Sequence, residues 1–131
     1  MARIYLAARY ARRVELCAYA DALRDLGHTI DARWLLGLHQ AADDDYARWA
    51  EFAADDIEDL GRADVVVSFT EPSRSAPSNR GGRHVEHGMA LALGKTVMIV
   101  GPLENVFHAL PQVRRFDTFP ELYRHLDGGL K

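Results

Sequence analysis

Uninterrupted apolar runs, separated by stretches with helical periodicity, constrain the fold of this chain more than any other feature. Residues 65–67 are three consecutive valines, and residues 97–100 are likewise all apolar. Runs of this kind are typical of strands that are covered on both faces. The predicted strands are residues 3–7, 29–35, 64–69, 96–100 and, more weakly, 115–118.

Helical patterns lie between these predicted strands. The predicted helical segments are residues 16–26, 43–60, 85–93, 104–110 and 120–126. Gly27 and Gly94 follow two of them, as C-terminal caps do. Three aspartates open the segment from Asp43, where the helix dipole favours negative charge. Strand and helix therefore alternate, which predicts an α/β fold with a parallel sheet wrapped by helices.

Composition narrows the class of protein. A length of 131 residues suits one domain, and we expect residues 1–131 to form it. The net charge of −3 argues against nucleic-acid binding, because proteins that bind phosphate backbones are usually basic. Cys17 is the single cysteine, which excludes an intramolecular disulfide and suits a reducing cytosol. With no long apolar run and no signal-peptide core, we expect a cytoplasmic protein that makes no membrane contact.

Several cofactor and metal motifs are missing. Gly94-Lys95-Thr96 resembles the end of a P-loop, but the first glycine of that motif would fall on Met89. His84, Glu86 and His87 match no HExxH pattern, and no further ligand set is evident. Neither GxGxxG after the first strand nor GxSxG occurs. We therefore expect no metal and no cofactor.

Ligands of open parallel sheets bind beyond the carboxyl ends of the strands, which draws attention to three segments. These are residues 7–13, 71–87 and 101–108. In the second, Glu86 is expected in the first turn of a helix that begins after Gly81 and Gly82. Glu86 alone fits a glutamate stabilised by the helix dipole, Asp56 a solvated helix residue, and Tyr5 a core aromatic.

Taken together, four pieces of sequence resemble a known family. They are Ile4-Tyr5-Leu6-Ala7, Asp56 ahead of Ala63-Asp64-Val65-Val66-Val67, Gly82 with Val85-Glu86-His87-Gly88-Met89-Ala90, and Gly94-Lys95. Their order and spacing resemble the nucleoside 2-deoxyribosyltransferase-like family, which includes the 2′-deoxynucleoside 5′-phosphate N-hydrolases. The resemblance runs from Ile4 to about His108. It implies a flavodoxin-like, three-layer fold with a five-stranded parallel sheet in the order 2-1-3-4-5. It also implies a homodimer whose sites the neighbouring subunit completes.

The resemblance also implies roles for individual residues. Glu86 matches the family's catalytic glutamate, Tyr5 its tyrosine, and Asp56 its helix aspartate. Asn105 is similar to the active-site asparagine after the fourth strand. This sequence departs from the family at two positions. Arg80 stands where Asp or Ser is frequent, and His84 stands where Gly is usual.

Cleavage of an N-glycosidic bond suits these residue types. The sugar becomes oxocarbenium-like, which an ionised Glu86 can stabilise or trap covalently. We expect the helix N-terminus and Tyr5 to keep Glu86 ionised. The leaving base needs a proton, and Asp56 is the candidate acid if its surroundings raise its pKa.

Arginines near the expected site suggest a phosphate-bearing substrate. Arg9 follows the first strand directly and is the first candidate, because arginine and a helix N-terminus together bind anions. The predicted substrate contacts are Arg9, Ser78, Gly82, Arg83, Asn105 and His108. These observations favour a hydrolase that acts on a (deoxy)nucleoside 5′-monophosphate. The alternatives are a deoxyribosyltransferase that exchanges bases on free nucleosides and a nucleotide-binding module without turnover.

Overall fold

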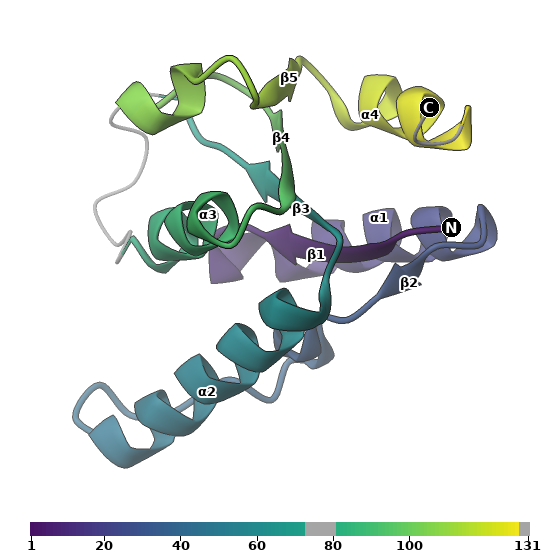
Figure 1. Cartoon of the computed structure of the whole chain (residues 1–131). Helices are drawn as coiled ribbons and strands as arrows, with labels where there is room; N and C mark the ends of the chain where they lie inside the picture. The colour runs from purple at the N-terminus through teal and green to yellow at the C-terminus, as the bar shows by residue number, and fades with distance from the viewer. Residues whose placement is uncertain (73–80, 129–131) are drawn as a thin grey trace.

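A computed structural model describes residues 1–72 and 81–128 of the chain (Figure 1). Its five strands form one sheet in the order β2-β1-β3-β4-β5, and every neighbouring pair is parallel. The strands are β1 (Arg3–Ala7), β2 (Thr29–Ile30), β3 (Val65–Phe69), β4 (Thr96–Val100) and β5 (Arg114–Phe116). The strand order and direction confirm the fold that the resemblance implied.

In the described residues, four α-helices and three 3-10 turns lie between the strands or, for the last helix, after them. The α-helices are α1 (Arg13–Asp25), α2 (Tyr46–Arg62), α3 (Gly82–Ala92) and α4 (Phe119–Asp127); the 3-10 turns are η1 (Tyr10–Arg12), η2 (Arg33–Leu36) and η3 (Val106–Ala109). The Asp45 carboxylate caps α2 by accepting from the Arg48 amide at 3.2 Å. Gly27 and Gly94 have φ values of 98° and 71°, the left-handed conformation that ends helices.

Helices cover both faces of the sheet (Figure 1). Tyr19 of α1 stacks on Phe119 of α4 with ring centroids 4.0 Å apart, which places these two helices on one face. Helix α2 contacts α3 on the other face. All five residues of β3 are buried between the two helical layers, as its apolar run predicts.

Two predicted elements differ from the structure. The strand expected at residues 29–35 ends at Ile30, and η2 follows it. Side-chain hydrogen bonds turn this segment away from the sheet. Trp34 Nε1 donates to the Leu6 carbonyl at 2.9 Å, and the Arg33 amide donates to Asp59 at 2.8 Å. The helix expected at residues 104–110 is only the 3-10 turn η3.

The described segments, residues 1–72 and 81–128, contain no helix that is both long and apolar enough to cross a membrane. Ser78 and Arg80, which the sequence singled out, lie outside the described residues.

Candidate active site

A cavity of about 460 Å³ opens beyond the carboxyl end of β1, next to the N-terminus of α3. Strand β1 is flanked by β2, which precedes α2, and by β3, which precedes α3. From β1 the chain adds β2 on one side of the sheet and then β3 on the other. Open α/β sheets bind ligands at such a point, where the strand order changes direction. The cavity is lined by Ala8, Arg9, Tyr10, Ala11, Trp34, His39, Phe52, Asp56, Gly81, Gly82, Arg83 and Glu86.

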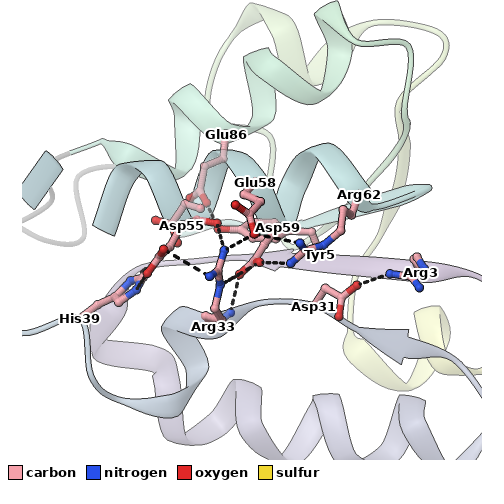
Figure 2. A network of polar contacts seen from close by, with 11 residues as sticks. Arg3, Tyr5, Asp31, Arg33, His39, Asp55, Glu58, Asp59, Arg62 and Glu86 are labelled. Carbon is pink, nitrogen blue, oxygen red and sulfur yellow. Dashed lines mark hydrogen bonds and ion pairs between the residues drawn. The ribbon is translucent and has the colours of Figure 1, made fainter. Parts of the chain in front are cut away.

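Glu86 and Tyr5 meet at the inner end of this cavity. Tyr5 is fully buried on β1, and its hydroxyl donates a hydrogen bond to Oε2 of Glu86, which lies on α3 (Figure 2). Only a strand residue whose side chain points toward the α2–α3 layer can make this contact, because side chains alternate between the two faces of a sheet. The structure therefore brings together the first and third catalytic candidates, which are 81 residues apart in the sequence.

Asp56 lines the same cavity from α2. Its Oδ1 atom is buried and has no hydrogen-bond partner among the described residues. A buried carboxyl oxygen without a partner is costly when it is charged, so the pKa of Asp56 is raised above its usual value. Asp56 and Glu86 thus line one cavity, and Tyr5 lies behind it, hydrogen-bonded to Glu86.

Burial raises the pKa of both carboxyls. The pKa of Glu86 rises to about 8; the hydrogen bond from Tyr5 opposes this shift and the charge of Asp56 adds to it. The pKa of Asp56 rises to about 6, again through burial, and His39 opposes that shift. Desolvation therefore dominates at both positions, and the two carboxyls share about one proton at neutral pH.

The distribution of that proton differs from our prediction. We expected Glu86 to be ionised and Asp56 protonated, but the higher pKa belongs to Glu86. One reason is its position in the helix. Since α3 begins at Gly82, Glu86 lies in the second turn, where the dipole of the helix N-terminus is already weak.

The two arginines predicted to bind substrate have different surroundings. Arg9 lines the cavity, and its Nη1 is 3.6 Å from Glu71 Oε1, which is longer than a hydrogen bond. Arg83 also borders the cavity, but its side chain is only 4% exposed and donates to both carboxylate oxygens of Glu104. Its guanidinium mainly ties α3 to the segment after β4. Gly82 lines the cavity as the first residue of α3.

Asn105 and His108 do not line the cavity. Asn105 caps η3 by accepting from the Phe107 amide at 3.0 Å, and its Nδ2 lies 3.4 Å from both His84 Nδ1 and His108 Nε2. Burial lowers the pKa of His108 to about 4. Within one chain these residues therefore belong to a histidine cluster beside α3. No three or more His, Cys, Asp or Glu side chains in residues 1–72 and 81–128 are grouped to hold a metal ion.

The predicted site residues did not include the four aromatic side chains that line the cavity. They are Tyr10, Trp34, His39 and Phe52. His39 and its neighbours follow β2, one of the two strands whose carboxyl ends were not considered. The rule that pointed to the loops after the first, third and fourth strands would have found His39 if it had been applied to the second.

Comparison with known proteins places these features in context. A family model described as nucleoside 2-deoxyribosyltransferase matches residues 4–117. Among solved structures, the 2-deoxyribosyltransferase of Bacillus psychrosaccharolyticus aligns with a TM-score of 0.72 and 21% identity, over 92% of this chain and 90% of that one. A CMP N-glycosidase of Clostridium botulinum aligns with a TM-score of 0.61 and 19% identity, over 95% and 98%. A conserved protein of Enterococcus faecalis V583 aligns with a TM-score of 0.70 and 16% identity, over 99% of both chains. No curated protein sequence gives a match.

The raised pKa of Glu86 predicts that this residue lowers stability at alkaline pH. A carboxyl whose pKa is about 8 when folded and 4.5 when unfolded stabilises the fold below pH 4.5, and this contribution is lost as the pH rises through 8. We expect Glu86→Gln to be about 1–3 kcal/mol more stable than wild type at pH 9 and nearly equal to it at pH 5. Urea unfolding at both pH values measures this difference. An identical difference at pH 5 and pH 9 would contradict the raised pKa.

Proposed function

Because the chain belongs to the nucleoside 2-deoxyribosyltransferase family, we propose that it hydrolyses the N-glycosidic bond of a (deoxy)nucleoside 5′-monophosphate. Membership of this family shows the general type of activity: the protein is an enzyme of the N-glycosidase or deoxyribosyltransferase type, which cleaves the glycosyl bond of nucleosides or transfers the glycosyl group. The observation that carries the finer proposal is the pair of partly buried carboxyls, Glu86 and Asp56, that line one cavity together with Arg9.

In the first step, the ionised Glu86 attacks C1′ of the sugar. The bond between C1′ and the base nitrogen breaks, and the proton of Asp56 goes to the leaving base. The product is a glycosyl ester of Glu86 and a free base. The hydroxyl of Tyr5 donates to Glu86 and favours the ionised form that this attack requires.

In the second step, water attacks C1′ and the ester bond to Glu86 breaks. The Asp56 carboxylate, left by the first step, accepts the proton from water, so both carboxyls return to their starting states. This cycle needs the single shared proton on Asp56. The positive charge that develops on the sugar favours that arrangement, because it stabilises an anionic Glu86.

The N-terminus of α3 and Arg9, which also line the cavity, provide groups that can bind a phosphate. The backbone N–H groups of Gly82 and Arg83, in the first turn of α3, have no partner within the helix, and such groups bind anions. Arg9 adds a cation on the same cavity wall, with only a long ion pair to Glu71. The aromatic rings of Tyr10, Trp34 and Phe52 line the cavity and provide apolar surface for a base.

A homodimer would explain the residues that one chain leaves away from the cavity. Val85 of α3 and Val106 and Phe107 of η3 are exposed by 63%, 78% and 60%. Exposed apolar side chains grouped on adjacent elements are typical of protein–protein interfaces. A second copy packed on this surface would bring its own Asn105 toward the site, as the family resemblance implies.

The role of Glu86 is tested by base release. We expect Glu86→Gln to lose on the order of a thousandfold or more in kcat, since a carboxylate that acts only in the transition state contributes several kcal/mol. Chromatography of a panel of nucleosides and nucleoside monophosphates measures the released base. Glu51→Gln, an exposed change on the same helix as Asp56, serves as the matched control and should keep full activity. Retention of a tenth of the activity by Glu86→Gln would exclude it as the nucleophile.

The phosphate contact is tested by Arg9→Ala. We expect kcat/KM for a deoxynucleoside 5′-monophosphate to fall about tenfold to a hundredfold, because a charge-assisted pair contributes roughly 1.5–3 kcal/mol. The rate on the corresponding nucleoside should not change. Arg24→Ala, a half-exposed arginine on α1, is the control. Equal wild-type rates on nucleotide and nucleoside would refute the phosphate contact.

The same assay separates hydrolase from the two alternatives. A new nucleoside that contains an added free base would identify a transferase. Ligand binding without any base release over hours would identify a binding module.

The dimer is tested by light scattering at micromolar concentration. We expect a mass of twice 14.7 kDa for wild type and a monomer for Phe107→Asp, because the charge would be buried in the interface. Val14→Asp alters another exposed apolar residue, on α1, and should leave the dimer intact. A monomer mass for wild type would rule the dimer out.

A further inference from the structure

His39 lies in the loop between η2 and α2 and lines the same cavity as Asp56. Its side chain is only 9% exposed. The ring stacks on Phe52, with centroids 4.5 Å apart and an angle of 20° between the planes. Packing therefore fixes the plane of the imidazole, so that its two nitrogens point in defined directions.

Each of the two ring nitrogens faces a carboxylate of α2. Nε2 lies 3.3 Å from Asp55 Oδ2, and Nδ1 lies 3.7 Å from Asp56 Oδ1. The second oxygen is the buried atom that has no hydrogen-bond partner among the described residues. The imidazole thus lies between a partly exposed carboxylate and the carboxyl that the proposed mechanism uses as acid.

Asp55 is itself held in place. Arg33 Nη1 is 3.4 Å from Asp55 Oδ1, and Arg33 Nη2 donates to the Asp55 carbonyl at 3.3 Å. Figure 2 shows Asp55 between His39 and Arg33. An anchored carboxylate at Nε2 fixes the orientation of a histidine and leaves Nδ1 for the reacting group.

We propose that His39 is a positioning residue for Asp56: anchored by Asp55, it presents Nδ1 to the Asp56 carboxyl and shares one proton with it. This inference rests on the proposed function, in which Asp56 protonates the leaving base.

The exchange between the two residues involves one proton and no other group. When Nε2–H donates to Asp55, Nδ1 is an acceptor and receives a hydrogen bond from the protonated Asp56. If the proton moves from Oδ1 to Nδ1, an Asp56 carboxylate faces an imidazolium. The 3.7 Å separation needs only a small movement to become a hydrogen bond, and catalytic contacts are often this long before they tighten.

Titratable and charged groups on several neighbouring elements surround this pair. Asp55 and Asp59 lie on α2, Arg33 on η2, Tyr5 on β1 and Glu86 on α3. Burial, Asp59 and Asp55 raise the pKa of Asp56, whereas His39 and the hydrogen bond from Tyr5 lower it. Of these influences, His39 is the largest that opposes burial. We therefore expect removal of His39 to raise the pKa of Asp56.

The first experiment compares pH profiles of wild type, His39→Gln and His125→Gln. Glutamine keeps hydrogen-bonding capacity but carries no charge. We expect a bell-shaped profile of kcat/KM for wild type, with limbs near the two coupled carboxyl pKa values of about 6 and about 8. In His39→Gln the limb near 6 should move up by about 0.5–1 pH unit. His125 lies at a different cavity, beside β5, so His125→Gln should give the wild-type profile. If His39→Gln folds and the limb of its profile stays near pH 6, as in wild type, the proposal is overturned.

The second experiment needs no turnover. Carbon-13 NMR follows the titration of the Asp56 carboxyl, with the signal assigned by its absence in Asp56→Asn. We expect a higher midpoint in His39→Gln than in wild type, and the same midpoint would overturn the proposal. If His39→Gln does not fold, His39→Asn takes its place. If wild type releases no base, the proposed function fails while the NMR titration still decides whether His39 and Asp56 share a proton.

Discussion

The hydrogen bond from Tyr5 to Glu86 joins β1, inside the sheet, to helix α3. Tyr5 is fully buried on β1, which lies between β2 and β3, so its position is fixed by the sheet. The phenol hydroxyl is the polar end of a side chain that is otherwise packed in the core. Its contact with Glu86 sets the inner end of the cavity and orients the carboxyl that the proposed mechanism uses as nucleophile.

A second constraint orients the helix on the other side of the cavity. Asp59 of α2 is fully buried; it accepts from the Arg33 amide at 2.8 Å and forms ion pairs with the side chains of Arg33 and Arg62. Asp56 lies three residues earlier, on a neighbouring part of the same helix face. The bonds to Asp59 thus fix the rotation of α2 and place Asp56 in the cavity, while Arg33 also anchors Asp55 behind His39.

Part of the site could be predicted from the sequence. The valine run of β3 predicted a buried parallel strand, and the resemblance to the family, carried by motif order and spacing, singled out Tyr5, Asp56 and Glu86 together. Arg83 shows the limit of such reasoning. Its sequence position beside Gly82 suggested a substrate contact, but its guanidinium is paired with Glu104, a partner 21 residues away that no local pattern indicates.

The sequence by itself determined the alternation of strands and helices and the family motifs, because apolar periodicity and motif spacing are local properties. Only the tertiary structure decided the short length of β2, the place of His39 between two carboxylates, and the higher pKa of Glu86 relative to Asp56. Each of these depends on burial and on charges from distant segments. A pKa responds to desolvation by everything packed around the group, and that environment exists only once the chain has folded.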